Sequence, residues 1–204
     1  ASGDATGTSW ANASDSLQVM MDDASAGDTI WVAAGTYYPT SSPDDISTDP
    51  RDKAFHLSKN IKIYGGFAGT EELLSERDWV ANETILSGDF DADDAVSGIG
   101  ASLLISNTTE NAYHVFIVTT ATSPILDGLT IKGGNANGSG TMYLNGNPFF
   151  RSLGGGIYVR FGNIQLSNLK IMNNSAGFGG GFYLDAKPPT VMTNVNIDKT
   201  LNGG

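Results

Sequence analysis

The sequence reads GGGIYV at residues 154–159 and GGGFYL at residues 179–184, so a six-residue pattern recurs after 25 positions. Three further segments share the order polar, Gly or Asn, apolar, polar, apolar, and they cover residues 127–131, 167–171 and 193–197. Their spacings are 40 and 26, and the longer one contains the Asn- and Gly-rich stretch 137–152. A unit of this length cannot bury its own apolar face, so it stacks on its neighbours.

Outside these repeats the chain is a series of short apolar runs separated by Gly, Asn, Asp, Ser and Pro, such as residues 54–57, 61–64, 113–118 and 125–131. Almost no helical pattern lies between them, which excludes Rossmann and TIM-barrel arrangements and leaves a sandwich, a barrel or a solenoid. The repeat favours the solenoid. In that fold alternate residues point inward, and Gly and Asn form the corners where the backbone needs φ > 0.

One helix is expected near the amino terminus, over residues 15–24. Ser14 or Asp15 can cap its start, and Leu17 and Met20 lie on one apolar face. Because so short a helix must lie on something apolar, we expect it to cover the first turn, or rung, of the solenoid. We expect one domain over 1–204, with a cap at 1–27, rungs over 28–204 and loop excursions at about 39–53, 68–83, 89–111 and 137–153.

Composition excludes several classes of partner. Eleven Lys and Arg against 22 Asp and Glu give a net charge of −11, which repels nucleic acid and anionic lipid. No apolar run approaches the length of about 20 residues that spans a bilayer, so the chain is not expected to be transmembrane. The absence of Cys excludes disulfides and Cys-based zinc sites.

Several segments carry a family resemblance. Residues 7–13 (GTSWANA) and 27–37 (GDTIWVAAGTY) resemble the amino-terminal cap and first rung of secreted bacterial right-handed parallel β-helix proteins. Residues 64–71, 86–89 and 112–115 are similar to later landmarks of a subgroup whose repeats resemble those of the chlamydial polymorphic outer-membrane proteins. GGGIY departs from the chlamydial Gly-Gly-Ala-Ile form, so kinship with that branch is distant.

The resemblance implies a fold and a location. The fold class is all-β, a right-handed parallel β-helix (β-solenoid) with an N-terminal capping α-helix, and the location is extracellular or at the cell surface. Function remains open at this point, because the same scaffold serves lyases, glycosidases and adhesins.

The acidic run at residues 89–94 is a candidate metal site. Asp89, Asp91 and Asp93 place carboxylates at alternate positions, a spacing that a loop can wrap around Ca²⁺. It is no EF-hand, because Gly100 stands where that loop carries a bidentate Glu. Solvated loop acids are the simpler interpretation, and a structural calcium is the only cofactor that the sequence suggests.

No catalytic residue is assigned. A lyase could use Arg160 and Lys170 as base and charge neutraliser, but the favoured interpretation is that both are outward-facing strand residues. His56 and His114 lie within strand-like runs and are expected to be strand residues rather than ligands or bases. The ionisable residues in or beside the repeat strands do not recur at matching positions, and they are Asp127, Lys132, Arg160, Lys170 and Asp185.

Aromatic residues suggest a binding surface. If Ile157 and Phe182 point inward, Tyr158 and Tyr183 point outward one rung apart, where they could stack on a glycan or on each other. The excursion 137–152 is too apolar for a free loop, so it is expected to fold onto the flank of the solenoid or onto a partner.

The preferred hypothesis is a non-enzymatic extracellular surface protein, a rigid β-helical rod for adhesion or for structural, filamentous assembly. The alternative is a polysaccharide lyase or glycoside hydrolase on the same scaffold. Residues 191–197 repeat the rung pattern and the sequence ends at residue 204 with no capping pattern after them. We therefore expect self-association, or further repeats of a longer chain, at the carboxyl-terminal edge, with glycans as further candidate partners.

Overall fold

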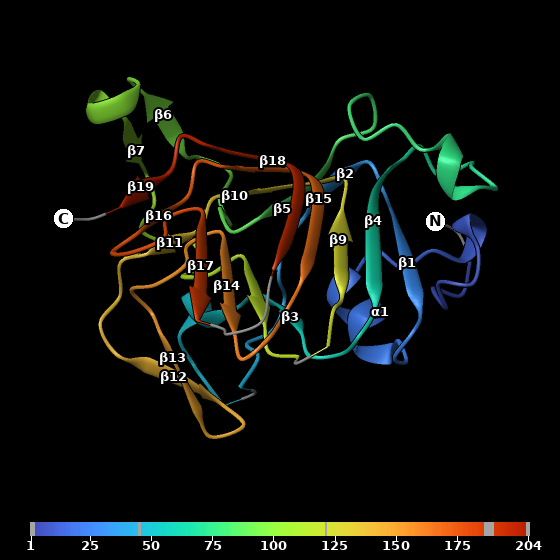
Figure 1. Ribbon diagram of the computed structural model, residues 1–204, viewed down its shortest axis with the longest axis horizontal. Coiled ribbons are helices and arrows are strands. Elements are labelled where there is room, and N and C mark those ends of the chain that lie inside the picture. The colour runs from blue at the N-terminus through green and yellow to red at the C-terminus, as the bar shows by residue number, and fades with distance from the viewer. Residues whose placement is uncertain (1–2, 45, 121, 186–189, 203–204) are drawn as a thin grey trace.

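The computed structural model describes residues 3–44, 46–120, 122–185 and 190–202. It is mostly β, and its large parallel sheet curls around an axis (Figure 1). The α-helix of the described residues is α1 (Leu17–Asp23), and four short 3-10 helices lie at Trp10–Asn12, Pro50–Asp52 (η2), Leu74–Glu76 and Gly100–Ser102. No helix in this part of the chain is long and apolar enough to cross a membrane.

The largest sheet has eight strands. It contains β1 (Thr29–Ala33), β2 (Gly35–Tyr37), β4 (Lys62–Phe67), β5 (Thr84–Ser87), β9 (Ile125–Asp127), β10 (Leu129–Lys132), β15 (Gln165–Met172) and β18 (Val191–Asp198). The long strand β15 pairs with β9 through its first half and with β10 through its second half, because the backbone bends between them. Figure 1 shows β1, β4, β9, β15 and β18 side by side along the coil.

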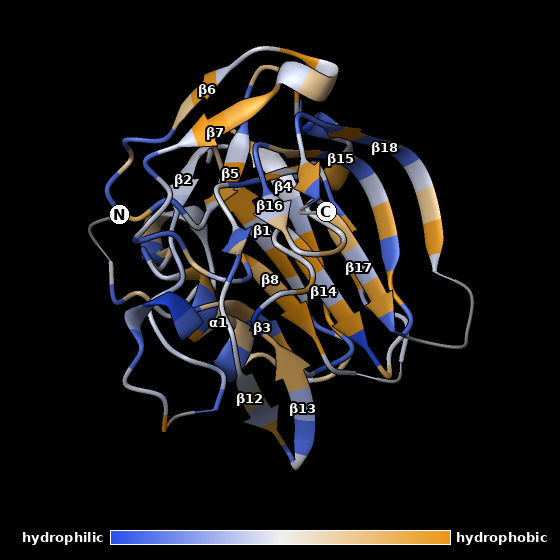
Figure 2. Cartoon of the chain, turned by 90° about the vertical axis from the view of Figure 1, so that its left-hand side faces the viewer, coloured by the Kyte–Doolittle hydropathy of each residue, from blue (hydrophilic) through white to orange (hydrophobic). Residues whose placement is uncertain are grey.

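Two further parallel sheets close the coil. One contains β3 (Phe55–Leu57), β8 (Phe116–Val118), β14 (Ile157–Arg160) and β17 (Phe182–Asp185). The other contains β11 (Asn135–Ala136), β16 (Ser175–Ala176) and β19 (Leu201–Asn202). Figure 2 shows β8, β14 and β17 side by side, hydrophobic along much of their length.

The strand registers follow the repeats of the sequence. β14 pairs with β17 so that Ile157 lies beside Phe182, an offset of 25 residues. In the large sheet Ile131 lies beside Ile171, and Ile171 beside Ile197, which are the offsets of 40 and 26. The prediction that the repeats stack in parallel is confirmed.

Residues with positive φ stack at the corners. Gly128, Asn168 and Asn194 have φ of 74°, 51° and 52°, in the region where Gly and Asn are tolerated. Asn194 Nδ2 donates to Asn168 Oδ1 at 2.7 Å, and Asn168 Nδ2 donates to Asp127 Oδ1 at 2.9 Å. The expected placement of Gly and Asn at positive-φ corners is confirmed here, and the asparagine side chains form a hydrogen-bonded ladder from rung to rung.

The inner face of the coil is a continuous apolar core. It runs from the helix residues Leu17 and Met21, through Phe55 and Phe116, to Ile171. The alternation along each strand explains this, because every second residue points inward.

Helix α1 lies at the amino-terminal end of the coil, against β1 and β3. It begins at Leu17, later than expected, because Ser16 is the N-cap whose Oγ accepts the Val19 N–H. The buried Gln18 accepts the His56 N–H of β3 through Oε1 at 3.0 Å. The helix therefore covers both the core and part of a strand edge, as a cap does.

Two excursions form antiparallel hairpins that project from the coil (Figure 1). They are β6–β7 (Ala95–Ser97 and Leu104–Ser106) and β12–β13 (Thr141–Leu144 and Asn147–Phe150). Met142, Leu144 and Phe149 of the second hairpin are buried against the outer side of β14. That excursion therefore folds onto the flank of its own chain.

Candidate functional site

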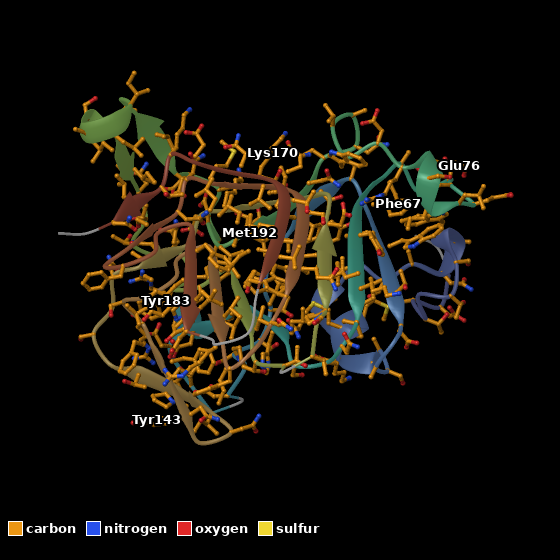
Figure 3. All side chains as sticks on the ribbon, in the orientation of Figure 1. Phe67, Glu76, Tyr143, Lys170, Tyr183 and Met192 are labelled. Carbon is orange, nitrogen blue, oxygen red and sulfur yellow. The ribbon has the colours of Figure 1, made fainter. Side chains whose placement is uncertain are left out.

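The carboxyl-terminal end of the coil is open. Met192 and Ile197 of β18 are 43% and 46% exposed, although their in-register neighbours on β15, Leu166 and Ile171, are fully buried. Met192 is labelled on the last strand of the large sheet in Figure 3. These side chains have the identity and direction of core residues, and among the described residues no further rung covers them.

β17 repeats this arrangement in the second sheet. Leu184 is 38% exposed, whereas its partner Val159 on β14 is fully buried. One face of the last rung is thus an apolar surface that crosses two sheets of the coil.

The backbone edge of the last rung also has no partner strand in the described part of the chain. β18 pairs with β15, β17 with β14 and β19 with β16, and within the described residues no strand pairs with their other edges. The Val191 N–H donates to Ile164 O at 3.2 Å, back toward the preceding rung. Because N–H direction alternates along a strand, the Met192 N–H points toward the open edge.

The acidic run places its carboxylates differently from the prediction. Asp89 is 5% exposed and its carboxylate accepts the backbone N–H groups of Asp93 and Asp94. The third carboxylate of the cluster is Glu110, which reaches Asp89 and Asp93 so that the three ligand atoms lie within 4.8 Å of one another. Asp91 is exposed and does not belong to this group. Its place in the predicted triad is therefore wrong.

Burial and the repulsion between neighbouring carboxylates disfavour the charged form of Asp94 in this acidic cluster. Burial, together with the smaller effect of the nearby charges of Asp89, Glu110 and Asp93, raises the pKa of Asp94 to about 6, and two hydrogen bonds from the Asn111 amide oppose this rise. Glu110 Oε1 and Asn111 Oδ1 are buried and have no hydrogen-bond partner among the described residues. Carboxylate and amide oxygens in such a cluster are ligands that a hard divalent cation prefers.

The expectation of two exposed, stacked tyrosines is wrong. Tyr158 is fully buried beneath the β12–β13 hairpin, where its ring packs at 4.9 Å from Phe149 and 5.4 Å from His114. Burial raises the pKa of its hydroxyl. Tyr183 meets Tyr158 edge-on at 5.1 Å and is only partly buried (Figure 3). The outward direction of Tyr158 was predicted correctly, but the hairpin covers it.

The residues that a lyase would need are held in separate ion pairs. Arg160 lies 3.5 Å from Asp185, donates to Pro148 O and is packed among phenylalanine rings. Lys170 pairs with Glu83 at 3.1 Å.

The other two ionisable residues of the repeat strands lie elsewhere. Asp127 pairs with Arg77 at 2.7 Å, and Lys132 lies beside Asp89 and Asp94 in a small cleft. These strand residues do not converge on one point.

Both histidines have structural partners. His56 is in β3 and its Nε2 lies 2.9 Å from Thr119 Oγ1. His114 is fully buried just before β8, with Nδ1 at 3.0 Å from Gly154 O, and burial lowers its pKa to about 4. His114 is therefore neutral at pH 7 and acts as a core residue.

One ionic group was not anticipated. Asp52 of η2 is buried, and Arg151 donates to both of its oxygens, through Nε at 2.8 Å and through Nη2. Arg151 also lies over the ring of Tyr113. This group joins the end of the β12–β13 excursion to a loop about a hundred positions earlier, a pairing that no local pattern could indicate.

Comparisons with protein-family models, with curated proteins and with solved structures found no match to this chain.

Proposed function

We propose that this chain is a right-handed parallel β-helix that serves as a rigid, non-enzymatic scaffold for adhesion or assembly at an extracellular surface. The observation that carries the proposal is the contrast between β18 and β15. In-register residues that are fully buried in one rung are about half exposed in the next, beside a strand edge that no described strand pairs with. Such an end is a template for a further strand.

The partner at this end is a further rung of the same repeat, from a longer form of the chain or from a second copy. For two copies we favour contact through both open ends. Helix α1 and Gln18 cover part of the opposite end, which opposes head-to-tail stacking into a filament. A two-fold contact between open ends buries the same apolar residues on both sides and closes as a dimer.

The placement of the ionic groups supports a scaffold over an enzyme. Arg160 and Lys170, the two residues a lyase could have used, are engaged with Asp185 and Glu83 rather than directed at a shared groove. The alternative of a polysaccharide lyase or glycoside hydrolase predicts shortened or unsaturated products from a panel of acidic and neutral glycans.

Light scattering over a range of concentrations tests the assembly. We expect a monomer that converts to a dimer as concentration rises. Met192→Pro removes an N–H that points to the open edge while leaving the bond of Val191 to Ile164 in place, so it should abolish the dimer. Met192→Ala retains that N–H and is the matched control. A chain that stays monomeric at high concentration, or a dimer unaffected by Met192→Pro, would contradict the proposal.

We also propose that the acidic cluster binds a divalent cation such as Ca²⁺. Three close carboxylates and the two unpaired buried oxygens of Glu110 and Asn111 support it. A cation bound only to the folded chain raises its melting temperature, so a chelator should lower that temperature. Glu110→Gln should remove the sensitivity and Asp91→Asn should preserve it. Identical melting with calcium and with chelator would leave the cluster as solvated acids.

A further inference from the structure

A groove of about 640 Å³ lies at the amino-terminal end of the coil, between β1 and the segment 6–14 that precedes α1. Leu17, Met20, Ile30 and Val32 supply apolar surface within it. In the described part of the chain, β1 pairs with β4 along one edge and with no strand along the other. The volume is that of a site for a small molecule.

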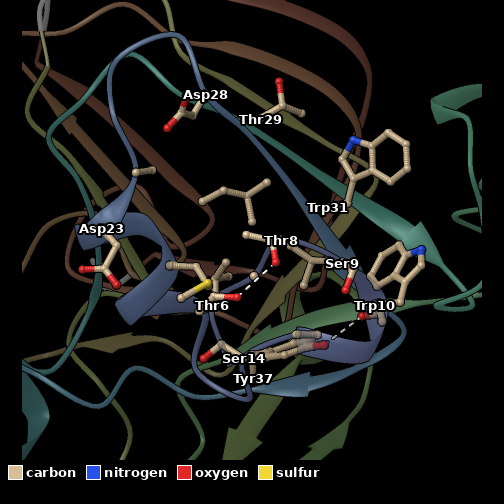
Figure 4. A pocket seen from close by; sticks show the side chains of 18 of the residues that line it. Thr6, Thr8, Ser9, Trp10, Ser14, Asp23, Asp28, Thr29, Trp31 and Tyr37 are labelled. Carbon is tan, nitrogen blue, oxygen red and sulfur yellow. Dashed lines mark hydrogen bonds between the residues drawn. The ribbon is translucent and has the colours of Figure 1, made fainter. Parts of the chain in front are cut away.

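Two tryptophans form one end of the groove (Figure 4). The ring of Trp31 stacks on the buried Phe67 at 4.7 Å and 11°, and Trp10 packs on the same ring at 5.4 Å. Trp10 Nε1 donates to Glu71 O at 2.9 Å, which fixes its orientation. Both indoles remain partly exposed, so the groove has flat apolar surfaces that are already held in position.

Polar groups converge from the other side. Asp23 and Asp28 lie at the end opposite the tryptophans, with the hydroxyls of Thr6, Thr8 and Ser14 between them (Figure 4). Thr6 and Thr8 share a hydrogen bond of 3.1 Å. Among the described residues that line the groove there is no Lys, Arg or His.

We infer that this groove binds a neutral carbohydrate. A sugar ring presents an apolar C–H face, which packs on an indole, and hydroxyl groups around its rim, which pair with carboxylates and hydroxyls. The acidic lining and the net charge of −11 oppose uronates, phosphates and sulfated glycans. A wholly apolar ligand would leave the carboxylates buried without partners, at a cost in free energy.

The inference deepens the adhesive part of the proposed function by naming its ligand class, and it uses the end of the coil opposite the assembly surface. The two proposals can therefore fail separately. Groove variants should leave the dimer of the open ends intact, and Met192→Pro should leave sugar binding intact.

The test is to titrate the full chain with cellotetraose, maltotetraose and chitotetraose. Calorimetry and tryptophan fluorescence measure the binding. At least one neutral tetrasaccharide should bind saturably and change the fluorescence. The third tryptophan, Trp79, is not in the groove, so Trp79→Phe should retain the fluorescence change. Tetragalacturonate, an anionic sugar of the same length, should not bind.

Two variants separate binding from folding. Trp31→Ala should weaken the affinity by about tenfold or more, and its melting temperature shows whether the fold survives. Asp23→Ala should weaken the affinity for the sugar by a similar factor, about tenfold. It should not unfold the chain, because Asp23 is exposed and stands at the carboxyl end of α1, where a negative charge does not stabilise the helix.

Three results would overturn the inference. One is the absence of binding by every neutral tetrasaccharide up to about 10 mM, the weak end of specific recognition. Another is binding that is equally tight in Asp23→Ala and in folded Trp31→Ala. The third is binding of an extended peptide in place of any sugar, which would assign the groove to strand addition on the free edge of β1.

Discussion

Ile171 and Ile197 form a matched pair for testing the open end. They are the same residue type, they lie beside each other in register on β15 and β18, and both belong to the inward-facing row. Ile171 is fully buried, whereas Ile197 is 46% exposed. Ile171→Ala removes buried methyl groups and leaves a cavity, so it should lower the free energy of unfolding by about 3–4 kcal/mol.

Ile197→Ala should cost much less in the monomer. About half of the side chain already contacts water, and the space that it leaves opens to solvent, so a loss of about 1 kcal/mol is expected. For a chain of this length these values correspond to falls in melting temperature of about 6–16 °C and 2–4 °C, respectively.

Urea unfolding of both variants by circular dichroism, at a concentration where scattering finds a monomer, measures the difference. At a concentration where the dimer forms, the cost of Ile197→Ala should rise, because the partner then buries that side chain. Equal losses for the two variants in the dilute monomer would refute the argument, since Ile197 would then already be covered.

Three other sets of variants test particular contacts. Met21→Asp places a charge in the core beneath the cap and should cost several kcal/mol in urea unfolding, about 3–5, whereas Val19→Asp on the exposed face of the same helix should cost under about 1. Because the folded pKa of Asp94 is raised to about 6 from 3.8, the folded state binds more protons at Asp94 between these values, so the contribution of Asp94 to stability should fall as pH rises from 4 to 6. Asp94→Asn should remove this contribution, so its melting temperature relative to the unsubstituted chain should rise over the same pH range. Arg151→Met leaves the buried Asp52 charge unpaired and should cost about 3–5 kcal/mol, and adding Asp52→Leu should recover part of the loss in a double-mutant cycle.

The repeating part of the fold was predictable from the sequence because stacking repeats carry their own register. The recurrence of GGGIYV after 25 positions already placed Ile157 beside Phe182, and the Asn and Gly positions indicated the corners. The cap was predictable because a short amphipathic helix needs an apolar surface. The bend of β15 between β9 and β10 was not resolved into two strand pairings, since apolar and polar residues alternate in the sequence on both sides of Asn168.

Contacts made by the excursions were not predictable. Glu110 joins Asp89 only because the loop that carries β6 and β7 returns to its starting point, and no spacing in the sequence encodes that return. The burial of Tyr158 depends in the same way on where the β12–β13 hairpin lands. Trp10 and Trp31 were recognised as part of the cap and first rung, yet their common contact with Phe67 emerged only in three dimensions.

Residue-resolved hydrogen exchange along β18 tests the central claim most directly. In the dilute monomer the Val191 amide, bonded to Ile164 O, should be protected, and the Met192 amide should exchange freely at the open edge. At concentrations where copies pair, the Met192 amide should gain protection and the alternation should disappear. Equal protection of both amides in the dilute monomer, or an alternation that persists at every concentration, would contradict the account of an open strand edge that recruits its partner.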